Sequence, residues 1–281
     1  MSDHPTQHVG LIGWPVEHSV SPAMHNAAFE ELGLHWHYSL LPTPPDGVEA
    51  RLATLYADGY QGVNVTVPHK RAVMSHLDEI SEAARAIGAV NTILARRDRL
   101  TGHNTDCDGF MSALAEVGVQ AVGKRALILG AGGGARSVVY ALTREGTTIA
   151  IHNRTEERAK DLIRDLSLAD SQASVVNDLG RLDLDQFDLL VNTTSLGMWP
   201  QTNASPWPDA LPMPFHWTVF DLVYNPAETR LLARARAAGA ATIGGLGMLV
   251  HQGVLAFEMW TGQSPSVEAM CLAATRALKN K

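Results

Sequence analysis

A lysine that follows a short strand and a proline is the first candidate for chemistry in this sequence. Val63, Val65 and Val67 alternate with polar residues, the period-two pattern of a strand with one buried face. Pro68 cannot donate a backbone hydrogen bond and ends that strand. Lys70 then lies at or near the first turn of a helix, where the helix dipole disfavours a cation. Either this lysine extends into solvent or its ammonium is placed there to act on a ligand.

Polar side chains gather at the ends of the predicted strands in the same part of the chain. They are Ser19, Ser21, Asn64, Thr66, Asn91 and Asp106. Open α/β folds bind ligands at the ends of their strands. Together with Lys70 these residues supply hydroxyls, amides, one cation and one carboxylate, which suits a small polyhydroxylated acid. Ser21 before Pro22 is also a good helix N-cap, which would explain that serine but not Ser19.

A glycine-rich loop follows the predicted strand 126–129. The loop residues Gly130, Ala131, Gly132, Gly133, Gly134 and Ala135 form a G-x-G-x-x-A pattern, and a predicted helix continues over 137–143. In this strand–turn–helix context such a loop binds the pyrophosphate of a dinucleotide at the helix N-terminus. The alternative, a purely structural tight turn, explains the glycines less well because the strand and the helix are both in place.

The end of the next predicted strand, 149–152, selects the cofactor. NAD sites usually carry a carboxylate about twenty residues after the glycine loop, which binds the ribose 2′-hydroxyl. Here the strand ends in Asn153, Arg154 and Thr155, and Arg158 follows one helical turn later. Guanidinium groups match the geometry of phosphate, so we expect the 2′-phosphate of NADP rather than NAD.

Strand-like and helix-like stretches alternate along the chain, which predicts an α/β fold with largely parallel strands. In the first part we expect strands at 9–12, 36–41 and 63–67, helices at 22–32, 45–58 and 106–117, and a hairpin of 89–95 with 100–104. In the second part we expect strands at 126–129, 148–152, 174–176, 189–192, 219–222 and 241–243, with a helix at 155–166 that Thr155 caps. Helices at 248–261 and 267–278 should return to the first domain.

The predicted organisation is therefore a two-domain α/β protein. Residues 1–104 plus 247–281 would form an α/β substrate domain with a mainly parallel sheet. Residues 105–246 would form an inserted Rossmann-like domain that binds NADP. The active site is expected in the cleft between the two domains.

Composition narrows the class of protein further. The 281 residues are 46% hydrophobic and 18% charged, which is ordinary for a globular protein and enough for two domains. A net charge of −7 without a basic stripe argues against a nucleic-acid partner. The sequence predicts a cytoplasmic protein with no membrane partner. It has only two cysteines, a polar N-terminal segment (1–8) and no apolar run long enough to span a membrane. The histidines follow no metal-ligand spacing, so no metal site is expected, and a homodimer stays open as the assembly.

Taken in order, these segments resemble the shikimate dehydrogenase family over nearly the whole chain. The matching stretches are Ser19-Val-Ser21, Asn64-Val-Thr-Val-Pro-His-Lys70, Gly88-Ala-Val-Asn91-Thr92, Asn104-Thr-Asp106, the glycine loop, Asn153-Arg-Thr-x-x-Arg158, Asn192-Thr-Thr-Ser195 and Gly245-Leu-Gly-Met-Leu-Val-His-Gln252. The resemblance implies an NADP-dependent enzyme that reversibly reduces 3-dehydroshikimate to shikimate, a step in chorismate and aromatic amino acid biosynthesis.

The resemblance also implies roles for individual residues. Lys70 and Asp106 would form the catalytic pair, with Lys70 as general acid and base. Substrate contacts would come from Ser19, Ser21, Asn64, Thr66, Lys70, Asn91, Asp106, Tyr224 and Gln252. Cofactor contacts would come from Glu82, Gly130, Ala131, Gly132, Gly133, Gly134, Asn153, Arg154, Thr155, Arg158, Leu222 and Gly245.

Three positions depart from the family's usual pattern. Gly244 stands where many relatives carry aspartate, Leu222 where methionine is common, and His69 where other residues are often found. Leu222 keeps an apolar surface for the nicotinamide, and the sequence offers no mechanism for His69.

Two alternative functions stay open at this point. A quinate/shikimate dehydrogenase of the same fold would need room near Ser19 and Ser21 for the additional hydroxyl of quinate. A non-catalytic NADP-binding sensor would be expected to lose Lys70 or Asp106, and both are present. Initial rates with shikimate and quinate, each with NADP⁺ and NAD⁺, separate these alternatives.

Overall fold

The chain folds into two units, each built on one sheet. The structure is a computed structural model that describes residues 5–279; residues 1–4, part of the polar N-terminal segment, and residues 280–281 lie outside the described range. The first unit runs to Gly109 and resumes at Val250, and the second unit is Phe110–Leu249. The predicted α/β fold class is confirmed, whereas the predicted roles and bounds of the two domains stay predictions.

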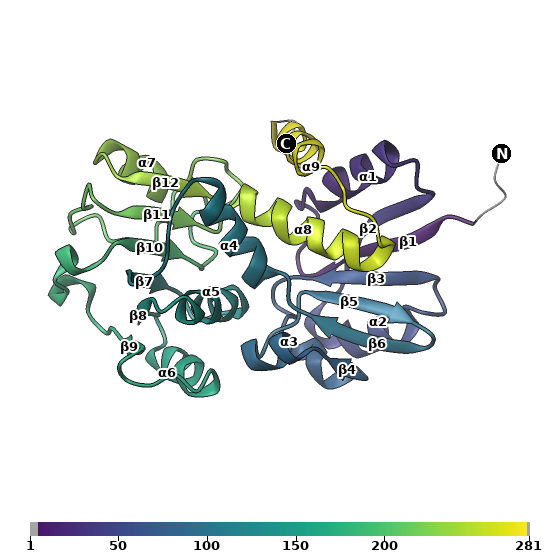
Figure 1. Cartoon of the computed structure of the whole chain (residues 1–281), viewed down its shortest axis with the longest axis horizontal. Helices are drawn as coiled ribbons and strands as arrows, with labels where there is room; N and C mark the ends of the chain where they lie inside the picture. The colour runs from purple at the N-terminus through teal and green to yellow at the C-terminus, as the bar shows by residue number, and fades with distance from the viewer. Residues whose placement is uncertain (1–4, 280–281) are drawn as a thin grey trace. The chain divides into compact units, whose positions relative to one another are not determined.

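The first unit contains a mixed sheet. Over the described residues it has six strands in the order β2-β1-β3-β5-β6-β4 (Figure 1). The strands are β1 (Gln7–Gly13), β2 (Trp36–Pro42), β3 (Tyr60–Val65), β4 (Glu79–Ile80), β5 (Thr92–Arg96) and β6 (Arg99–His103). Strand β1 pairs in parallel with β2 and β3, and β4 pairs in parallel with β6. Strand β5 runs antiparallel to both β3 and β6.

The hairpin predicted between 89–95 and 100–104 is present as β5 and β6. Its turn residues Arg97 and Asp98 have φ angles of 53° and 59°. Two successive positive φ angles define the type I′ turn, whose twist matches that of the flanking strands. The turn brings the end of β6 beside the start of β5, next to Asn91.

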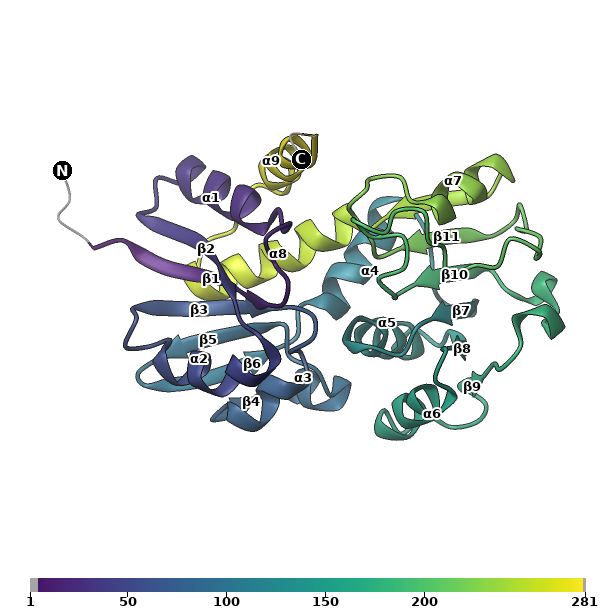
Figure 2. The same ribbon diagram turned by 180° about the vertical axis from the view of Figure 1, so that it is seen from behind.

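Helices cover both faces of this first sheet. They are α1 (Ser21–Glu31), η1 (Pro45–Gly47), α2 (Val48–Thr54), η2 (Ala72–His76), α3 (Glu82–Ile87) and α9 (Val267–Lys279), with the start of α4 (Asp106–Glu116) and the end of α8 (Leu246–Thr261). Figure 2 shows α1 beside α9, and the two helices pack against each other. On another side of the sheet, Val63 and Ile93 pack with Leu52 and Leu55 in one buried cluster.

The segment around Lys70 differs from its prediction in three ways. Strand β3 ends at Val65, and the side chain of Val67 is 67% exposed rather than buried. Asn64 is buried, so β3 is covered on both faces and its polar residues do not face solvent. The residues after Pro68 form a turn and then the short 3₁₀ helix η2, which starts two residues after Lys70. The helix expected over 45–58 is likewise shorter, consisting of η1 and α2.

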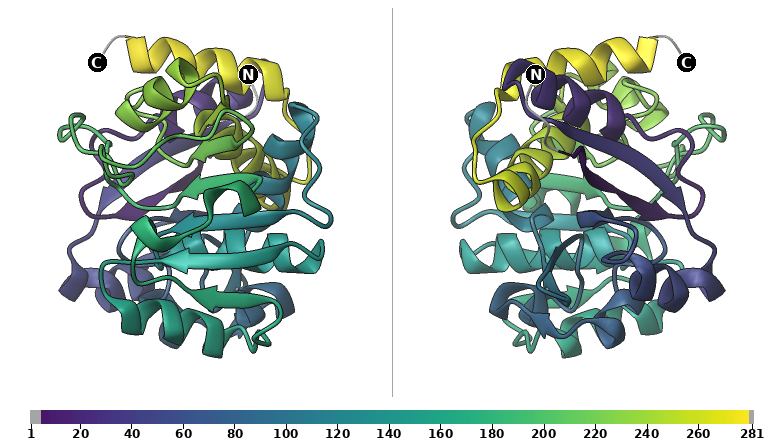
Figure 3. Two further views of the ribbon diagram at one scale, coloured as in Figure 1. Left: turned by 90° about the vertical axis from the view of Figure 1, so that its left-hand side faces the viewer. Right: turned by 90° about the vertical axis from the view of Figure 1, so that its right-hand side faces the viewer.

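The second unit is a parallel sheet of the dinucleotide-binding kind. Its described strands run in the order β12-β11-β10-β7-β8-β9 (Figure 3, left). They are β7 (Arg125–Leu129), β8 (Thr148–His152), β9 (Ala173–Val175), β10 (Leu189–Asn192), β11 (Thr218–Asp221) and β12 (Ala241–Gly244), and every pair is parallel. Read from β9, this is the 3-2-1-4-5-6 order, which places the switch point between β7 and β10.

Helices α5 (Gly133–Arg144), α6 (Glu156–Asp165) and α7 (Arg230–Ala237) pack on the strands next to them, with η3 (Leu179–Arg181) and η4 (Leu184–Gln186) in the connections. The proline-rich segment 199–214 is a loop, and it buries Trp207 against Trp217 in the core. Over the described range, the chain has no helix whose length and apolar character would let it cross a bilayer.

Candidate active site

The first unit brings Lys70 and Asp106 into direct contact. The Lys70 ammonium donates to Asp106 Oδ2 at 2.6 Å. The lysine side chain is 16% exposed and the aspartate side chain 6%, so the pair is largely withdrawn from water. An ammonium has three N–H donors, and Asp106 takes one of them. A cation held in this way can still donate to a ligand.

Backbone contacts, and not a helix, fix the position of Lys70. The Val90 N–H donates to the Lys70 carbonyl at 2.8 Å. The His69 ring is buried, and its Nε2 lies 2.7 Å from the Thr43 carbonyl oxygen. Because a carbonyl oxygen can only accept, Nε2 carries the proton and donates it. These two bonds attach the turn to the start of β5 and to the end of β2. His69 therefore has a local structural role that the sequence did not reveal.

Asp106 occupies the first position of α4, where a helix dipole favours a negative charge. The side-chain oxygen of Asn104 accepts the N–H groups of Asp106 at 3.1 Å and Cys107 at 3.3 Å. The Asn104 amide donates to the Ala89 carbonyl at 2.9 Å. Asn104 thus caps the helix and fixes the direction in which the Asp106 side chain leaves it.

Asn91 connects this aspartate to the last part of the chain. The Thr105 N–H donates to Asn91 Oδ1 at 2.7 Å, which settles which end of the amide is oxygen. The amide nitrogen then lies 2.9 Å from Asp106 Oδ1, 2.9 Å from Thr105 Oγ1 and 3.2 Å from Gln252 Oε1. Two N–H groups face three acceptors, and the Gln252 contact is the longest. Asn91, Asp106 and Gln252 are each buried.

The remaining predicted substrate residues of this unit lie at neighbouring strand ends. Ser19 donates to the Ser21 hydroxyl at 3.0 Å and accepts the Ser21 N–H at 3.2 Å, where the loop after β1 enters α1. The N-cap residue of α1 is Val20 rather than Ser21, so the capping explanation of Ser21 is wrong. Thr66 follows β3, and its N–H donates to the Ile12 carbonyl at 2.9 Å. The adjacent parallel strands β1 and β3 thus end at one edge of the sheet, as the prediction requires.

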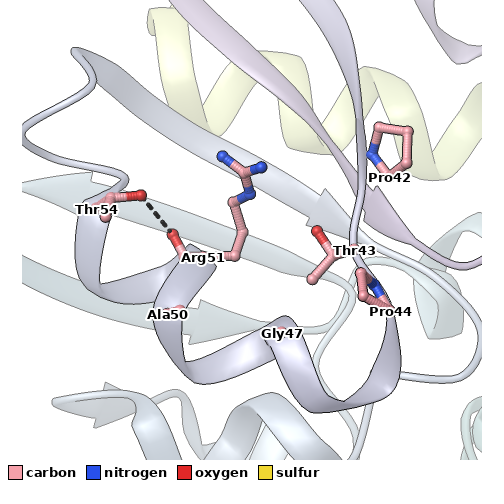
Figure 4. Close-up of a pocket in the computed structure, with 7 residues that line it drawn as sticks. All are labelled: Pro42, Thr43, Pro44, Gly47, Ala50, Arg51 and Thr54. Carbon is pink, nitrogen blue, oxygen red and sulfur yellow. Dashed lines mark hydrogen bonds between the residues drawn. The ribbon is translucent and has the colours of Figure 1, made fainter.

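A hollow of about 290 Å³ lies elsewhere in the first unit (Figure 4). It is lined by Pro42, Thr43, Pro44, Gly47, Ala50, Arg51 and Thr54. These residues include none of the predicted site residues. Thr43 links them to the lysine segment, through its carbonyl bond to His69.

The glycine loop of the second unit has the shape that a pyrophosphate needs. Gly130 has a φ of 109°, and a Cβ there would lie 2.6 Å from Thr193 Oγ1. A Cβ on Gly132 would meet nothing within 4 Å, so it would project into the open space before the N-terminus of α5. A Cβ on Gly134 would lie 3.4 Å from the Leu222 Cδ2, which places the predicted nicotinamide contact Leu222 against the loop. These features fit a bound dinucleotide.

The end of β8 presents two guanidinium groups to solvent. Arg154 and Arg158 are exposed, and within residues 5–279 neither forms an ion pair. Thr155 is the N-cap residue of α6, but its side chain makes no capping bond. The Asn153 amide donates to the Thr155 carbonyl at 2.7 Å. The carboxylates of Glu156 and Glu157, in the first turn of α6, pair with Lys160 and not with the two arginines. The guanidinium groups at the strand end therefore fit a 2′-phosphate.

Gly245, at the start of α8, is required by a close backbone approach. A Cβ there would lie 2.1 Å from the Leu222 carbonyl oxygen, so another residue would push the two segments apart. Tyr224 lies in the same unit, two residues after Leu222. Glu82 is the exposed first residue of α3 in the first unit. Hydrogen bonds therefore join four of the predicted site residues into one group, Lys70, Asp106, Asn91 and Gln252. For the other predicted residues, the structure gives the unit and the strand or helix end at which each one lies.

Sequence reasoning missed several buried residues that support these groups. They are Tyr38, Thr105, Asp221 and Thr229. A polar residue at a strand end or within a buried strand is the only local signal for them. Such a signal is too common to pick out particular residues without the fold.

Comparisons with known proteins show which family the chain matches. Residues 11–93 match a family model described as the shikimate dehydrogenase substrate binding domain, and residues 113–198 match one described as shikimate / quinate 5-dehydrogenase. Residues 245–270 match a shikimate 5′-dehydrogenase C-terminal domain. A shikimate dehydrogenase (NADP(+)) from Symbiobacterium thermophilum is 46% identical over 283 residues, covering 99% of this chain and 96% of the relative.

The chain belongs to the shikimate dehydrogenase family. A second member, the shikimate dehydrogenase (NADP(+)) of Moorella thermoacetica, is 48% identical over 93% of this chain and 90% of its own length. Among solved structures, the shikimate 5-dehydrogenase of Thermus thermophilus in complex with NADP(H) and shikimate has a TM-score of 0.87. It is 41% identical, over 96% of this chain and 99% of that chain. The resemblance inferred from the sequence motifs is confirmed.

Proposed function

We propose that this family member reversibly reduces 3-dehydroshikimate to shikimate with NADPH, as a step toward chorismate and the aromatic amino acids. The observation that carries the proposal is the 2.6 Å contact of a largely buried lysine and aspartate, with donor positions left on the lysine. A non-catalytic sensor would have no need of such a pair. Relatives named as NADP-dependent shikimate dehydrogenases cover nearly the whole chain, which supports the same conclusion.

Lys70 is the general acid in the direction of reduction and the general base in the direction of oxidation. When bound, NADPH supplies the hydride. The ketone oxygen of the substrate gains negative charge in the transition state, and the Lys70 ammonium stabilises this charge and donates the proton. Asp106 orients Lys70 and accepts a hydrogen bond from a neighbouring hydroxyl of the substrate. Asn91 donates to the other oxygen of Asp106 and so limits its rotation.

Hydroxyl and amide side chains hold the rest of the substrate. Ser19 and Ser21 bind its carboxylate end, and their paired hydroxyls are pre-ordered by the bond between them. The Thr66 hydroxyl has no partner among the described residues, so it is free to bind the substrate. Gln252, which contacts Asn91 at 3.2 Å, binds a substrate hydroxyl. Tyr224, a residue of the second unit, is the remaining predicted substrate contact.

NADP binds to the second unit. The loop Gly130–Gly134 at the start of α5 would hold its pyrophosphate, and Arg154 and Arg158, with Asn153 and Thr155, would hold its 2′-phosphate. Leu222 and Gly245 border the nicotinamide, where any larger residue at 245 would clash with the Leu222 carbonyl. Glu82 is the weakest of the predicted cofactor contacts.

Initial rates with two substrates and two cofactors test this proposal. We expect the highest kcat/KM with shikimate and NADP⁺, and much lower values with quinate or with NAD⁺. A higher kcat/KM for quinate would contradict the substrate assignment and favour the quinate/shikimate alternative. Binding of NADP⁺ without turnover of either acid would favour the sensor.

The location and assembly of the protein stay predictions. We expect a cytoplasmic enzyme with a small-molecule substrate, and a homodimer as the alternative to a monomer. Cell fractionation tests the first expectation, and size-exclusion chromatography with light scattering tests the second.

A further inference from the structure

Two hydroxyl groups lie behind the Lys70–Asp106 pair, on residues that no ligand can touch. Tyr38 in β2 is 1% exposed, and Thr92 in β5 is 0% exposed. Burying a hydroxyl costs free energy unless it forms hydrogen bonds. Both groups are bonded, and their partners lead to the active site.

The bonds form one chain of donors that ends at the catalytic carboxylate. The Tyr38 hydroxyl donates to Asn64 Oδ1 at 2.9 Å, and the Asn64 amide donates to Thr92 Oγ1 at 3.1 Å. Thr92 Oγ1 then donates to Asn91 Oδ1 at 3.2 Å, and the Asn91 amide donates to Asp106 Oδ1 at 2.9 Å. Every link donates in the same direction, so each bond polarises the next.

Thr92 contributes to the orientation of the Asn91 amide, together with the Thr105 N–H. The Thr92 hydroxyl accepts from the Asn64 amide and donates its single proton to Asn91 Oδ1 at 3.2 Å, with Thr105 Oγ1 3.3 Å away. With the Thr105 N–H on the same oxygen, this bond turns the NH₂ end of Asn91 toward Asp106. Loss of the hydroxyl would weaken this preference and leave the Asn64 amide without an acceptor.

Tyr38, at the far end of the chain, is held on two sides. The Asn26 side chain accepts the Tyr38 N–H at 2.7 Å and donates to the Tyr38 carbonyl at 3.0 Å. The His25 ring stacks on the tyrosine ring, with 4.4 Å between centroids and 2° between planes. Burial lowers the pKa of His25 to about 3, so this neighbour is neutral near pH 7. The hydroxyl of Tyr38 therefore has a fixed position from which to donate.

We propose that Thr92 and Tyr38 are positioning residues for the catalytic pair, acting through Asn64 and Asn91 to hold the Asp106 carboxylate in the orientation that receives Lys70. The inference rests on the proposed function of that pair. It also assigns Asn64 a role as an internal link, because both of its N–H groups donate within the protein, to Thr92 Oγ1 and to the Asn91 carbonyl.

Two substitutions at position 92 separate the hydroxyl from the shape of the side chain. Thr92→Val keeps the shape and removes the hydroxyl, whereas Thr92→Ser keeps the hydroxyl. We expect Thr92→Val to lower kcat for shikimate oxidation about tenfold, the effect of losing one hydrogen bond in a charged network, and to leave KM for shikimate within about threefold. Thr92→Ser should restore kcat to within about threefold of wild type. A purely structural role would not give this split between kcat and KM.

Tyr38→Phe tests the far end of the chain and has a matched control. Tyr60 lies in the same sheet, and its hydroxyl bonds to Ser39 Oγ at 3.1 Å, outside the chain of donors. We expect Tyr38→Phe to lower kcat about fivefold and Tyr60→Phe to leave it unchanged. If Thr92→Val does not fold, this pair of tyrosine variants decides the matter alone, and equal kcat values overturn the inference.

Lys70→Ala, measured alongside, separates failure of the inference from failure of the proposed function. The inference is overturned, and the function stands, if wild type oxidises shikimate, Lys70→Ala does not, and Thr92→Val and Tyr38→Phe keep wild-type kcat. If wild type does not oxidise shikimate with NADP⁺, the proposed function is overturned and the inference with it.

Discussion

Each unit buries one aspartate at the end of a strand or the start of a helix, and the two aspartates differ in the charge of their partners. Asp106 in the first unit receives the Lys70 ammonium. Asp221 in the second unit is fully buried, and among the described residues its donors are neutral. They are the Thr229 hydroxyl at 2.6 Å, the Asn192 amide at 2.8 Å and the Val223 N–H at 3.0 Å.

This difference separates a reactive carboxylate from a structural one. Burial raises the pKa of Asp221, while its three hydrogen bonds act in the opposite direction. Its donors come from the backbone and from short side chains, so Asp221 mainly fixes the loop that carries Leu222. Asp106 instead holds the ammonium of a long side chain, which can also donate to a ligand. Burial of a carboxylate alone therefore does not mark an active site; the nature of its partner does.

Removal of the cation should have the largest effect. We expect Lys70→Ala to lower kcat for shikimate oxidation by about 10²–10⁴-fold, the usual contribution of a positioned proton transfer, with little change in shikimate binding. The matched control is Lys124→Ala, because Lys124 pairs with Asp188 at 3.0 Å on the surface. Steady-state kinetics measure both. Near-normal turnover of Lys70→Ala would show that the cation beside Asp106 is not needed for catalysis. Asp106 would then be a structural aspartate, as Asp221 is.

His25 shows what burial does to an ionisable group whose ring nitrogens have no partner among the described residues. The pKa of His25 is about 3 in the folded protein, against 6.5 in the unfolded chain. The contribution of the neutral ring to the free energy of unfolding is therefore complete above pH 6.5 and is lost as the pH falls toward 3. At pH 4, wild type should lose about 3 kcal/mol of stability relative to His25→Phe, which cannot be protonated. Urea unfolding of wild type and His25→Phe at pH 4 and pH 8 measures this loss. If the two proteins differ in free energy of unfolding by the same amount at both pH values, the prediction is contradicted.

Substitutions on the cofactor side should act on KM rather than on kcat. We expect Arg154→Ala to raise KM for NADP⁺ about 10–100-fold, the effect of losing charge-assisted bonds to a phosphate, and to change KM for NAD⁺ little. Arg164→Ala, in the helix α6 that follows Arg154, is the control because its guanidinium pairs with Asp161. Initial rates at varied cofactor concentration measure these values. Equal increases for both cofactors would exclude a role in binding the 2′-phosphate.

The smallest effect is expected for Asp221→Asn. Because the folded-state pKa of Asp221 is raised above 3.8, the folded protein binds the proton more tightly than the unfolded chain does. The stability of wild type relative to Asp221→Asn should therefore be greatest in acid and should decline as pH rises through the raised pKa. Urea unfolding of both proteins from pH 4 to pH 8 tests the sign. The kcat of the variant at neutral pH should stay within a few fold of wild type.

Local chemistry made part of the fold predictable. The glycine loop after β7, the parallel strands β8 and β10, and the turn at Arg97 and Asp98 all follow from short-range rules on glycine, periodicity and turns. The alternation around Val63 was misleading because β3 is covered on both faces, so its polar residue Asn64 is buried as well.

The candidate site was predictable only where a motif carried it. Gln252 contacts Asn91 across 161 residues of sequence, and no periodicity could bring the two together. The family resemblance named both residues as substrate contacts, but it did not predict the contact between them. Tyr38 had no such signal, because a tyrosine in a buried strand usually contributes its ring to the core. Its link to Asn64 depends on the pairing of β1 with both β2 and β3, which only the fold provides.

Asn26 has a consequence beyond the position of Tyr38. Strand β2 is an outer strand of its sheet, and outer strands expose backbone groups to which another chain can add. Asn26 occupies both backbone groups of Tyr38 on that open side. A strand from a second molecule would have to displace this side chain and lose two hydrogen bonds before pairing there. One asparagine thus protects the sheet against edge-to-edge aggregation.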